Sequence, residues 1–221
     1  LPAWFHRVQN INRAYAAKHG YSYEFLKGPL TQHPFMDKIK IFNLLLQQST
    51  QNDVFLYIDT DAVVWNASIP LETFQYRRHD MILSGHEFGV GAHGEPIHPK
   101  TPDGRPAGVN AGVWIVRGTD WSKRLFRTWI EKEDRFGADD QKILQFMPSK
   151  GWVPDFYDHV HFVRAARLNM DDTKERLGLA TRPSAEFIVH CWGSLKRHMP
   201  EVLDDIEAHN LPPRLIVNDD F

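Results

Sequence analysis

Apolar residues recur along the chain with two periods, one typical of helices and one typical of strands. Over His6–His19 they recur every three or four positions and Gly20 follows, which predicts an amphipathic helix that stops at the glycine. The same spacing predicts a second helix over Asp37–Gln48. Between these two helices, Tyr21–Leu26 alternates between apolar and polar residues and predicts a short strand.

The segment Asp53–Trp65 carries the most strongly apolar strand of the pattern. Val54–Ile58 is apolar without alternation, which is typical of a central strand covered on both faces. This run ends on Asp59, and Asp61 follows before a second apolar run begins. Ligands of open α/β sheets bind where buried strands leave the sheet. The two carboxylates are therefore the first candidates for a functional site.

The rest of the chain continues to alternate between helices and strands, which predicts an α/β fold. The stretch Gly85–Gly108 is rich in Gly, Pro and His and has no periodicity, and we interpret this long loop as facing the substrate. The other predicted elements are a short helix or turn over Pro70–Tyr76, strands over Asp80–Gly85, Val109–Val116, Phe156–Val163 and Ala185–Val189, and helices over Trp121–Lys132, Gln141–Phe146 and Leu195–His209.

The domain organisation follows from the same order of elements. No repeat, low-complexity tract or linker divides the chain, so a single domain is predicted over residues 1–221. A further strand upstream of Leu1 would complete a series of βαβ units.

Composition narrows the class of protein. The chain is 42% hydrophobic and 24% charged, as in an ordinary globular domain, and its net charge of −2 offers no field for a nucleic acid or a membrane surface. No apolar run approaches the ~18 residues of a membrane span. The single cysteine, Cys191, excludes a disulfide within the chain and favours a reducing compartment, whereas Asn66-Ala67-Ser68 is a glycosylation sequon.

Asp59 and Asp61 together suggest a metal site. Side chains at positions i and i+2 of an extended segment point the same way, so both carboxylates could reach one ion while Thr60 points elsewhere. Two hard anionic oxygens suit Mg²⁺ or Mn²⁺ carrying a phosphate. The structural alternative is that one carboxylate caps a turn or helix and the other is solvated.

A second group of candidate residues follows the last predicted strand. His190 ends that strand as Asp59 ends the earlier one, and an imidazole beside two carboxylates favours Mn²⁺ over Mg²⁺. Gly193 allows a phosphate to approach the backbone, and Lys196 at the start of a helix could neutralise a diphosphate. The alternative is a His and a Lys on the surface without a function.

Three further groups are candidates, each with a structural alternative. A glycine inside a strand marks the close approach of a ligand, or else a β-bulge, and a neighbouring amide suits sugar hydroxyls. An acid at a helix start is as readily a cap as a ligand, and a lysine on a helix is as readily solvated. The residues concerned are Asn110-Ala111-Gly112, Asp139-Asp140-Gln141 and Lys38. Phosphate loops, nucleophile elbows and zinc-like Cys/His spacings are missing from the sequence.

In their order along the chain, these motifs resemble the retaining nucleotide-sugar glycosyltransferases of the GT-A fold. The first part of the chain is similar to the fungal and plant family of α-galactosyl-, α-mannosyl- and xyloglucan α-xylosyltransferases. The similarity lies in the opening Asn12-Arg13-x-Tyr15-Ala16-x-x-His19-Gly20-Tyr21, in Lys38 and in Ile58-Asp59-Thr60-Asp61-Ala62. The ending His190-x-x-Gly193-x-x-Lys196 is more similar to the glycogenin and lipopolysaccharide galactosyltransferase family. The resemblance extends from Asn12 to Lys196.

The resemblance implies a GT-A-like domain with a mixed, mainly parallel sheet flanked by helices. It implies a metal-dependent transfer of a hexose or pentose, with retention, from a nucleotide-diphosphate sugar to a glycan or another hydroxyl acceptor. A UDP-sugar would be the favoured donor and a GDP-sugar the alternative. The metal would be Mn²⁺, with Mg²⁺ possible, held on the diphosphate by Asp59, Asp61 and His190.

The same resemblance implies roles for the other candidates. The catalytic residues would be Asp140 and Gln141, with one of them as the attacking group. Alternatively, the acceptor attacks from the side of the leaving group, with a phosphate oxygen as its base. A first strand that helps to hold the base would lie upstream of Leu1, or else the base site would be incomplete. The donor-binding residues would be Lys38, Asp59, Asp61, Asn110, Ala111, Gly112, His190, Gly193 and Lys196.

Two other functional classes remain open from the sequence. A metal-dependent nucleotidyltransferase or phosphohydrolase would use the carboxylates and a metal, but it would leave Asn110 and Lys196 without a role. A non-catalytic sugar-binding domain would have sugar affinity without metal-dependent nucleotide affinity. The Golgi lumen fits the resemblance and the sequon, and a cytoplasmic enzyme is the alternative.

Overall fold

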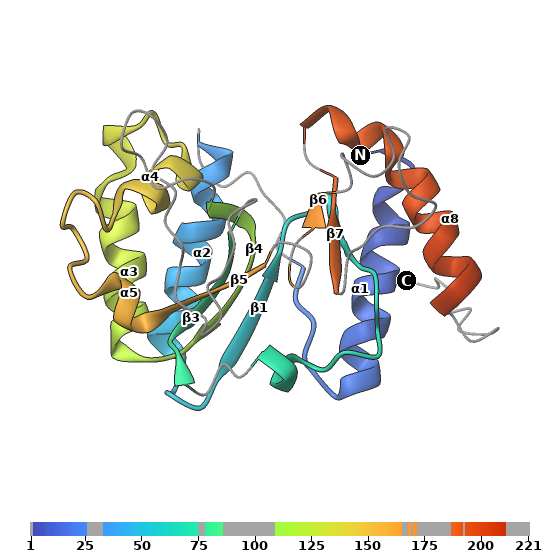
Figure 1. Cartoon of the computed structure of the whole chain (residues 1–221), viewed down its shortest axis with the longest axis horizontal. Helices are drawn as coiled ribbons and strands as arrows, with labels where there is room; N and C mark the ends of the chain where they lie inside the picture. The colour runs from blue at the N-terminus through green and yellow to red at the C-terminus, as the bar shows by residue number, and fades with distance from the viewer. Residues whose placement is uncertain are drawn as a thin grey trace.

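Two β-sheets lie next to each other in the middle of the molecule, with helices on the outer side of each (Figure 1). The computed structural model of the chain describes residues 2–25, 33–74, 78–85, 109–164, 168, 170–171, 187–191 and 193–210.

Four strands form the larger sheet. They are ordered β1 (Val54–Ile58), β4 (Val109–Arg117), β3 (Met81–Gly85) and β5 (Val160–Arg164). Strand β4 is antiparallel to β1 and to β3, and β3 is parallel to β5. Three of the four strands therefore run in one direction, and the predicted α/β fold with a mixed sheet is confirmed, although two of the three neighbouring pairs in this sheet are antiparallel.

The helices α2 (Pro34–Gln48), α3 (Asp120–Glu131) and α4 (Asp140–Phe146) lie on one side of this sheet (Figure 1). Their apolar stripes meet the sheet in a core built around aromatic rings, because helices that cover a sheet bury one face. The aromatic side chains of this core include Phe42, Trp114, Phe126, Trp129 and Phe156.

The smaller sheet has three strands in the order β2 (Ala62–Val64), β7 (Ile188–His190) and β6 (Met170–Asp171). Strand β7 is antiparallel to β2 and parallel to β6. The helices α1 (Phe5–His19) and α8 (Met199–Asn210) pack on this sheet through a separate apolar cluster, whose members include Val8, Ile11, Val63, Val189 and Leu203.

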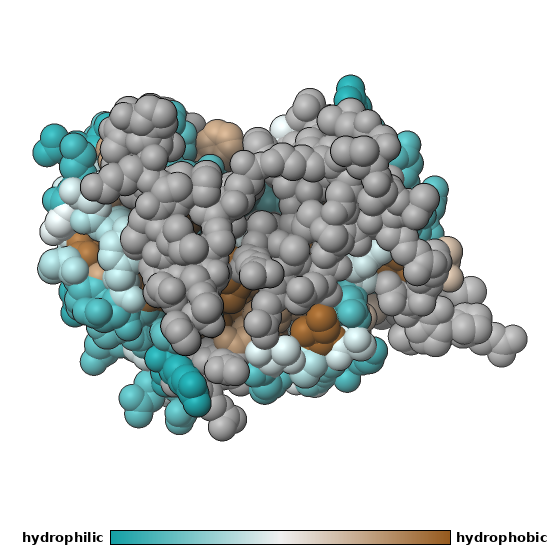
Figure 2. Space-filling view, viewed as in Figure 1, coloured by the Kyte–Doolittle hydropathy of each residue, from teal (hydrophilic) through white to brown (hydrophobic). Residues whose placement is uncertain are grey.

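The outward faces of α1, α3 and α8 are mainly polar. Hydrophilic residues cover the flank over α3 and the opposite flank over α1 and α8 (Figure 2). Among the described residues, no helix combines the length and the apolar character that a membrane span requires.

The predicted strand Asp53–Trp65 is divided between the two sheets. A β-turn separates β1 from β2, and the Ala62 amide donates to the Asp59 carbonyl at 3.0 Å. The prediction of a single extended segment through the Asp-x-Asp motif is therefore wrong. The motif lies where the chain leaves one sheet and enters the other.

The prediction that β1 is a central strand is also wrong for the described part of the sheet. Strand β1 stands at the end of the four-strand order, and all five of its residues are half-buried. Its sequence is apolar without alternation because both of its faces are packed. Phe55 and Tyr57 contact the core below the larger sheet, and Val54, Leu56 and Ile58 contact the cluster between the sheets.

The helices predicted over residues 6–19, 37–48, 121–132 and 141–146 are confirmed to within three residues. Residues 21–25, however, form no strand. Their alternation is explained by packing against α1, since the Tyr21 ring stacks on His19 at 5.5 Å and its hydroxyl donates to Glu72 at 2.7 Å. Alternation therefore reports one packed face and does not require a sheet.

Other boundaries differ in smaller ways. Helix α3 is capped by Thr119 and begins at Asp120, one residue before the predicted start. The first four residues of the strand expected over Phe156–Val163 form a short helix, α5 (Phe156–His159). The segment over Pro70–Tyr76 contains the 3-10 helix η1 (Leu71–Phe74). The C-terminal helix begins as the 3-10 helix η4 (Gly193–His198). Most of the predicted substrate loop, residues 86–108, lies outside the described residues.

Asn12 on α1 fixes the backbone of β2. Its side-chain amide donates to the Ala62 carbonyl at 3.1 Å, and its oxygen accepts from the Val64 amide at 2.9 Å. The residue is buried, so both backbone groups depend on this one side chain for a partner. The Asn-x-x-Tyr element of the opening motif thus holds the strand that follows Asp61.

We expect Asn12→Ala to lower the free energy of unfolding by about 2–4 kcal/mol, because two buried backbone groups lose their partners. Urea denaturation followed by circular dichroism measures this loss. Asn43→Ala is the matched control, since Asn43 bonds only to an exposed Gln47 across one turn of α2 and should cost less than ~0.5 kcal/mol. Equal losses in the two variants would contradict the role of Asn12.

Candidate functional site

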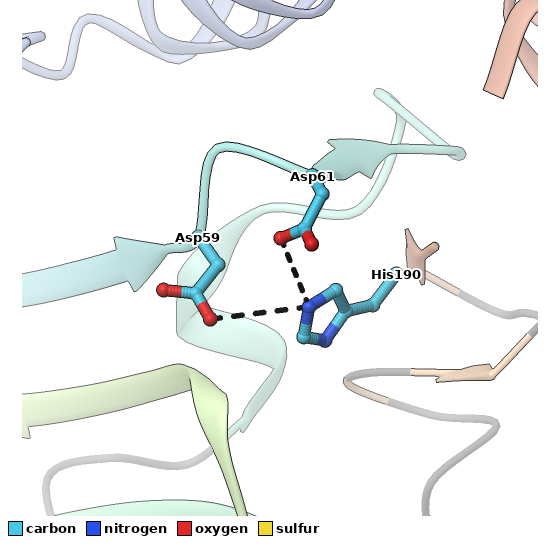
Figure 3. Close-up of side chains that lie close together, drawn as sticks. All are labelled: Asp59, Asp61 and His190. Atoms are coloured by element: carbon cyan, nitrogen blue, oxygen red, sulfur yellow. Dashed lines mark hydrogen bonds and ion pairs between the residues drawn. The ribbon is translucent and has the colours of Figure 1, made fainter. Parts of the chain in front are cut away.

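Asp59, Asp61 and His190 point toward one another at the seam between the two sheets (Figure 3). Asp59 follows β1, Asp61 precedes β2, and His190 ends β7. The His190 Nε2 atom lies 3.2 Å from Asp61 Oδ1 and 3.9 Å from Asp59 Oδ2. The three prospective ligand atoms lie within 4.8 Å of one another, so one ion could contact all of them.

Backbone hydrogen bonds hold these three residues in place. The Asp59 amide donates to the Gly112 carbonyl on β4, and the Cys191 amide donates to the Asp61 carbonyl, both at 2.8 Å. Ala62 also pairs with His190 in the β2–β7 ladder. Both carboxylates therefore converge on the imidazole as predicted, but a turn brings them together where an extended segment was expected.

Gly112 leaves the space that this cluster occupies. A Cβ atom on this residue would lie 2.2 Å from His190 Cε1 and 2.8 Å from Asp59 Oδ2. Any side chain at position 112 would therefore displace both the imidazole and the carboxylate. The sequence predicted the close approach of a ligand or a β-bulge at this glycine, and the groups that approach it are the side chains of Asp59 and His190, two of the three prospective metal ligands.

Asp61 is held in its charged form. Burial acts to raise its pKa, but the hydrogen bond from His190 and the charge of Lys196 outweigh this, and the pKa of Asp61 falls to about 2. The Lys196 Nζ atom lies 3.0 Å from Asp61 Oδ2 at the outer side of the cluster. Gly193 begins the 3-10 helix that carries Lys196, with a left-handed φ of 59° that glycine adopts at little cost.

The donor set fits a divalent metal. Two carboxylates and one imidazole form the mixed N/O set that suits Mn²⁺ better than Mg²⁺. The Nδ1 atom of His190 is buried and has no hydrogen-bond partner among the described residues. The orientation of the ring is therefore set from its Nε2 side, where the two carboxylates lie.

Lys38 connects Asp59 to the start of α4. Its Nζ atom lies 3.2 Å from Asp59 Oδ1 and 2.8 Å from Asp140 Oδ2, and it donates to the Ala111 carbonyl at 2.9 Å. Burial opposes its charge, yet the two carboxylates raise the pKa of Lys38 overall. The alternative of a solvated lysine is wrong, since its side chain is only 13% exposed.

The start of α4 supplies the next two candidates. Asp139 is the helix cap and accepts from the Lys142 amide, whereas Asp140 is buried and faces Lys38. Burial raises the pKa of Asp140, against the opposing charge of Lys38. The Gln141 side-chain oxygen accepts from the Ala111 amide at 3.3 Å. Asp140 and Gln141 are therefore connected to the site by their contacts with Lys38 and Ala111, respectively.

Residues 110–112 form an irregularity in β4, which was the structural alternative for this motif. The register of β4 against β3 shifts between Leu83 and Gly85. Side chains bind backbone groups here, because the Ala111 carbonyl accepts from Trp114 as well as Lys38, and Asn110 Oδ1 accepts from the Gly112 amide at 2.7 Å. The irregularity lies inside the site, so the two interpretations of the motif are compatible.

Tyr57 also belongs to the site, although no sequence motif indicated it. Its hydroxyl donates to Asp59 Oδ1 at 2.6 Å, and its ring stacks on Trp114 with the centroids 4.5 Å apart. Burial raises the pKa of Tyr57 well above its usual range, so the phenol stays protonated. The spacing of two residues between Tyr57 and Asp59 on a strand was the available signal.

Comparison with known proteins decides the family. A sequence model described as nucleotide-diphospho-sugar transferase matches residues 11–194. The chain belongs to the nucleotide-diphospho-sugar transferase family. Galactomannan galactosyltransferase 1 of Cyamopsis tetragonoloba is 23% identical over 114 residues, which are 50% of this chain and 24% of that relative. The match thus spans about a quarter of the relative's length.

Solved structures agree with the fold of this nucleotide-diphospho-sugar transferase. A glycosyltransferase involved in glycosylation of the major capsid of PBCV-1 superposes with a TM-score of 0.62 at 14% identity, over 93% of each chain. An active-site mutant of LgtC superposes with a TM-score of 0.50 at 14% identity, over 95% of this chain and 94% of that one. These likenesses confirm the GT-A-like architecture.

We expect Gly112→Ala to weaken Mn²⁺ binding more than about 10-fold, because the added methyl group displaces His190 and Asp59. Mn²⁺ titration followed by electron paramagnetic resonance measures the affinity. Gly118→Ala is the matched control: its Cβ would lie 2.3 Å from Ser49 Oγ, which is equally crowded but outside the site. It should lower thermal stability without changing Mn²⁺ affinity, and the same loss of affinity in both variants would contradict the specific role of Gly112.

Proposed function

We propose that this chain is a metal-dependent retaining glycosyltransferase. It would move a hexose or pentose from a nucleotide-diphosphate sugar, with UDP-sugars favoured over GDP-sugars, to a hydroxyl group of a glycan or another acceptor. The observation that carries the proposal is the convergence of Asp59, Asp61 and His190 in a chain of the nucleotide-diphospho-sugar transferase family. The name of the galactosyltransferase relative makes UDP-galactose the first donor to test.

The proposed donor site begins with the metal ligands. Asp59, Asp61 and His190 would hold Mn²⁺, with Mg²⁺ as the alternative, and a bound divalent ion stabilises the charge that grows on a diphosphate leaving group. Lys196 is half-exposed beside Asp61, so its ammonium group is available to phosphate oxygens. The exposed backbone at Gly193 leaves room for the same phosphates.

The proposed sugar site lies on the other side of Asp59. Asp140 and Gln141 would orient the transferred sugar or the acceptor, together with Lys38 and the Asn110-Ala111-Gly112 segment. Lys38 forms ion pairs with both Asp140 and the proposed metal ligand Asp59. The diphosphate and the sugar of the donor would therefore be bound by one connected set of charged side chains. This arrangement supports orientation as the main contribution of the chain to catalysis.

The surroundings of Asp140 and Gln141 favour one route to retention. The Asp140 carboxylate is buried and paired with Lys38, and the Gln141 oxygen is engaged by the Ala111 amide. Each group already has a partner within the protein. We therefore favour attack by the acceptor from the leaving-group side: its oxygen bonds to the anomeric carbon, the bond to the diphosphate breaks, and the acceptor proton passes to a phosphate oxygen.

Asp61→Ala should abolish Mn²⁺-dependent binding of UDP while leaving the fold intact. Calorimetric titration of UDP and GDP, with Mn²⁺ and then with EDTA, measures this and also identifies the base. Asp158→Asn, an exposed change on α5, is the control and should bind like the wild type. Wild-type-like binding by Asp61→Ala would refute the metal site, and sugar affinity without nucleotide affinity would indicate a binding domain.

Gln141→Ala should reduce kcat by about 10²-fold with little change in nucleotide affinity, because misplacement of the reacting groups costs rate rather than binding. Initial rates with the donor identified above measure the effect. Gln145→Ala is the matched control, since Gln145 lies one turn along α4 and donates to the Val109 carbonyl on the same strand. Equal losses of kcat and affinity would indicate that Gln141 is structural only.

A further inference from the structure

The two oxygens of the Asp59 carboxylate have different surroundings. Oδ1 accepts a hydrogen bond from the Tyr57 hydroxyl at 2.6 Å and lies 3.2 Å from Lys38 Nζ. Oδ2 faces His190 Nε2 at 3.9 Å (Figure 3). Two donors occupy Oδ1, so Oδ2 is the oxygen that remains for a cation shared with Asp61 and His190.

We propose that Tyr57 is a positioning residue of the metal site. Its hydroxyl holds Oδ1 and thereby keeps Oδ2 turned toward Asp61 and His190. The proposal rests on the proposed function, because it assigns a role relative to the metal that Asp59 would bind.

Tyr57 can hold the carboxylate because its own ring is held. The ring stacks on Trp114 with an interplanar angle of 19°, and it forms a T-shaped pair with Phe42, with the centroids 6.0 Å apart. Trp114 is fixed in turn by a hydrogen bond from its indole nitrogen to the Ala111 carbonyl at 3.0 Å. The hydroxyl group is thus presented to Asp59 from a rigid aromatic support, at the i−2 position of the same strand.

Lys38 cannot supply the same constraint alone. Its ammonium group is shared among Asp59, Asp140 and the Ala111 carbonyl, and its distance to Asp59 Oδ1 is longer than that of the phenol. An ammonium on a flexible stem attracts either oxygen of a carboxylate, whereas one hydroxyl group on a fixed ring selects one oxygen. Without the hydroxyl, the Asp59 carboxylate can rotate toward Lys38 and withdraw Oδ2 from the metal position.

The test is Tyr57→Phe, which keeps the ring on Trp114 and under Lys38 and removes only the hydroxyl. Titration of Mn²⁺ alone into the nucleotide-free protein, followed by electron paramagnetic resonance, measures affinity. We expect a loss of about 10-fold, the size typical of removing a hydrogen bond to a metal ligand, and an altered spectrum of the bound ion. Melting in EDTA reports the fold without metal and should change little.

Tyr23→Phe is the matched control. Tyr23 also has a cation over its ring, Arg13 at 5.5 Å, but it lies outside the site, so its loss of a hydroxyl should leave Mn²⁺ affinity unchanged. If Tyr57→Phe binds Mn²⁺ like the wild type and like Tyr23→Phe, the positioning role is overturned while the metal site stands. If the wild type itself binds no Mn²⁺, the metal part of the proposed function fails, and the positioning role fails with it.

Discussion

The turn from Asp59 to Ala62 is the constraint on which the site depends. It carries the chain from one sheet to the other, with Asp59 bonded to β4 and Asp61 bonded to the residue after β7. Each carboxylate is therefore anchored to a different sheet, and the imidazole arrives from the strand paired with β2. Because the packing of both sheets fixes the positions of these backbones, the cluster does not depend on a flexible loop for its geometry.

The charges around this turn leave a negative balance at its centre. Among the residues that the structure describes, the three carboxylates of Asp59, Asp61 and Asp140 pair with two ammonium groups, those of Lys38 and Lys196. Both lysines lie at the periphery of the cluster. Lys38 pairs with Asp140 at the start of α4, and Lys196, whose side chain is half-exposed, pairs with Asp61. The remaining negative potential lies between Asp59, Asp61 and His190, which is the arrangement a divalent cation would neutralise.

The sequence predicted the parts of this site better than their assembly. Amphipathic spacing located α1, α2, α3 and α4, and the order of the motifs located the residues that the structure brings together. Periodicity could not show that Val54–Ile58 and Ala62–Val64 belong to different sheets. Both runs are apolar and predict strands, and an apolar run does not indicate which sheet its strand joins. Periodicity also could not predict the hydrogen-bond partners of Ala111. Its amide donates to Gln141, 30 positions away, and its carbonyl accepts from Lys38, 73 positions away.

The orientation of the Asp59 carboxylate is constrained at both of its oxygens. The two constraints are the Tyr57 hydroxyl and the missing side chain of Gly112, the features of the site that the sequence indicated least. On the Oδ1 side, the Tyr57 hydroxyl and Lys38 engage the carboxylate. On the Oδ2 side, the missing side chain of Gly112 leaves space for this oxygen and for the His190 ring. The hydroxyl group of Tyr57 at Oδ1 and the space above Gly112 at Oδ2 favour the same rotamer of Asp59. The orientation of Asp59 is therefore built into two neighbouring strands, β1 and β4, before any ligand binds.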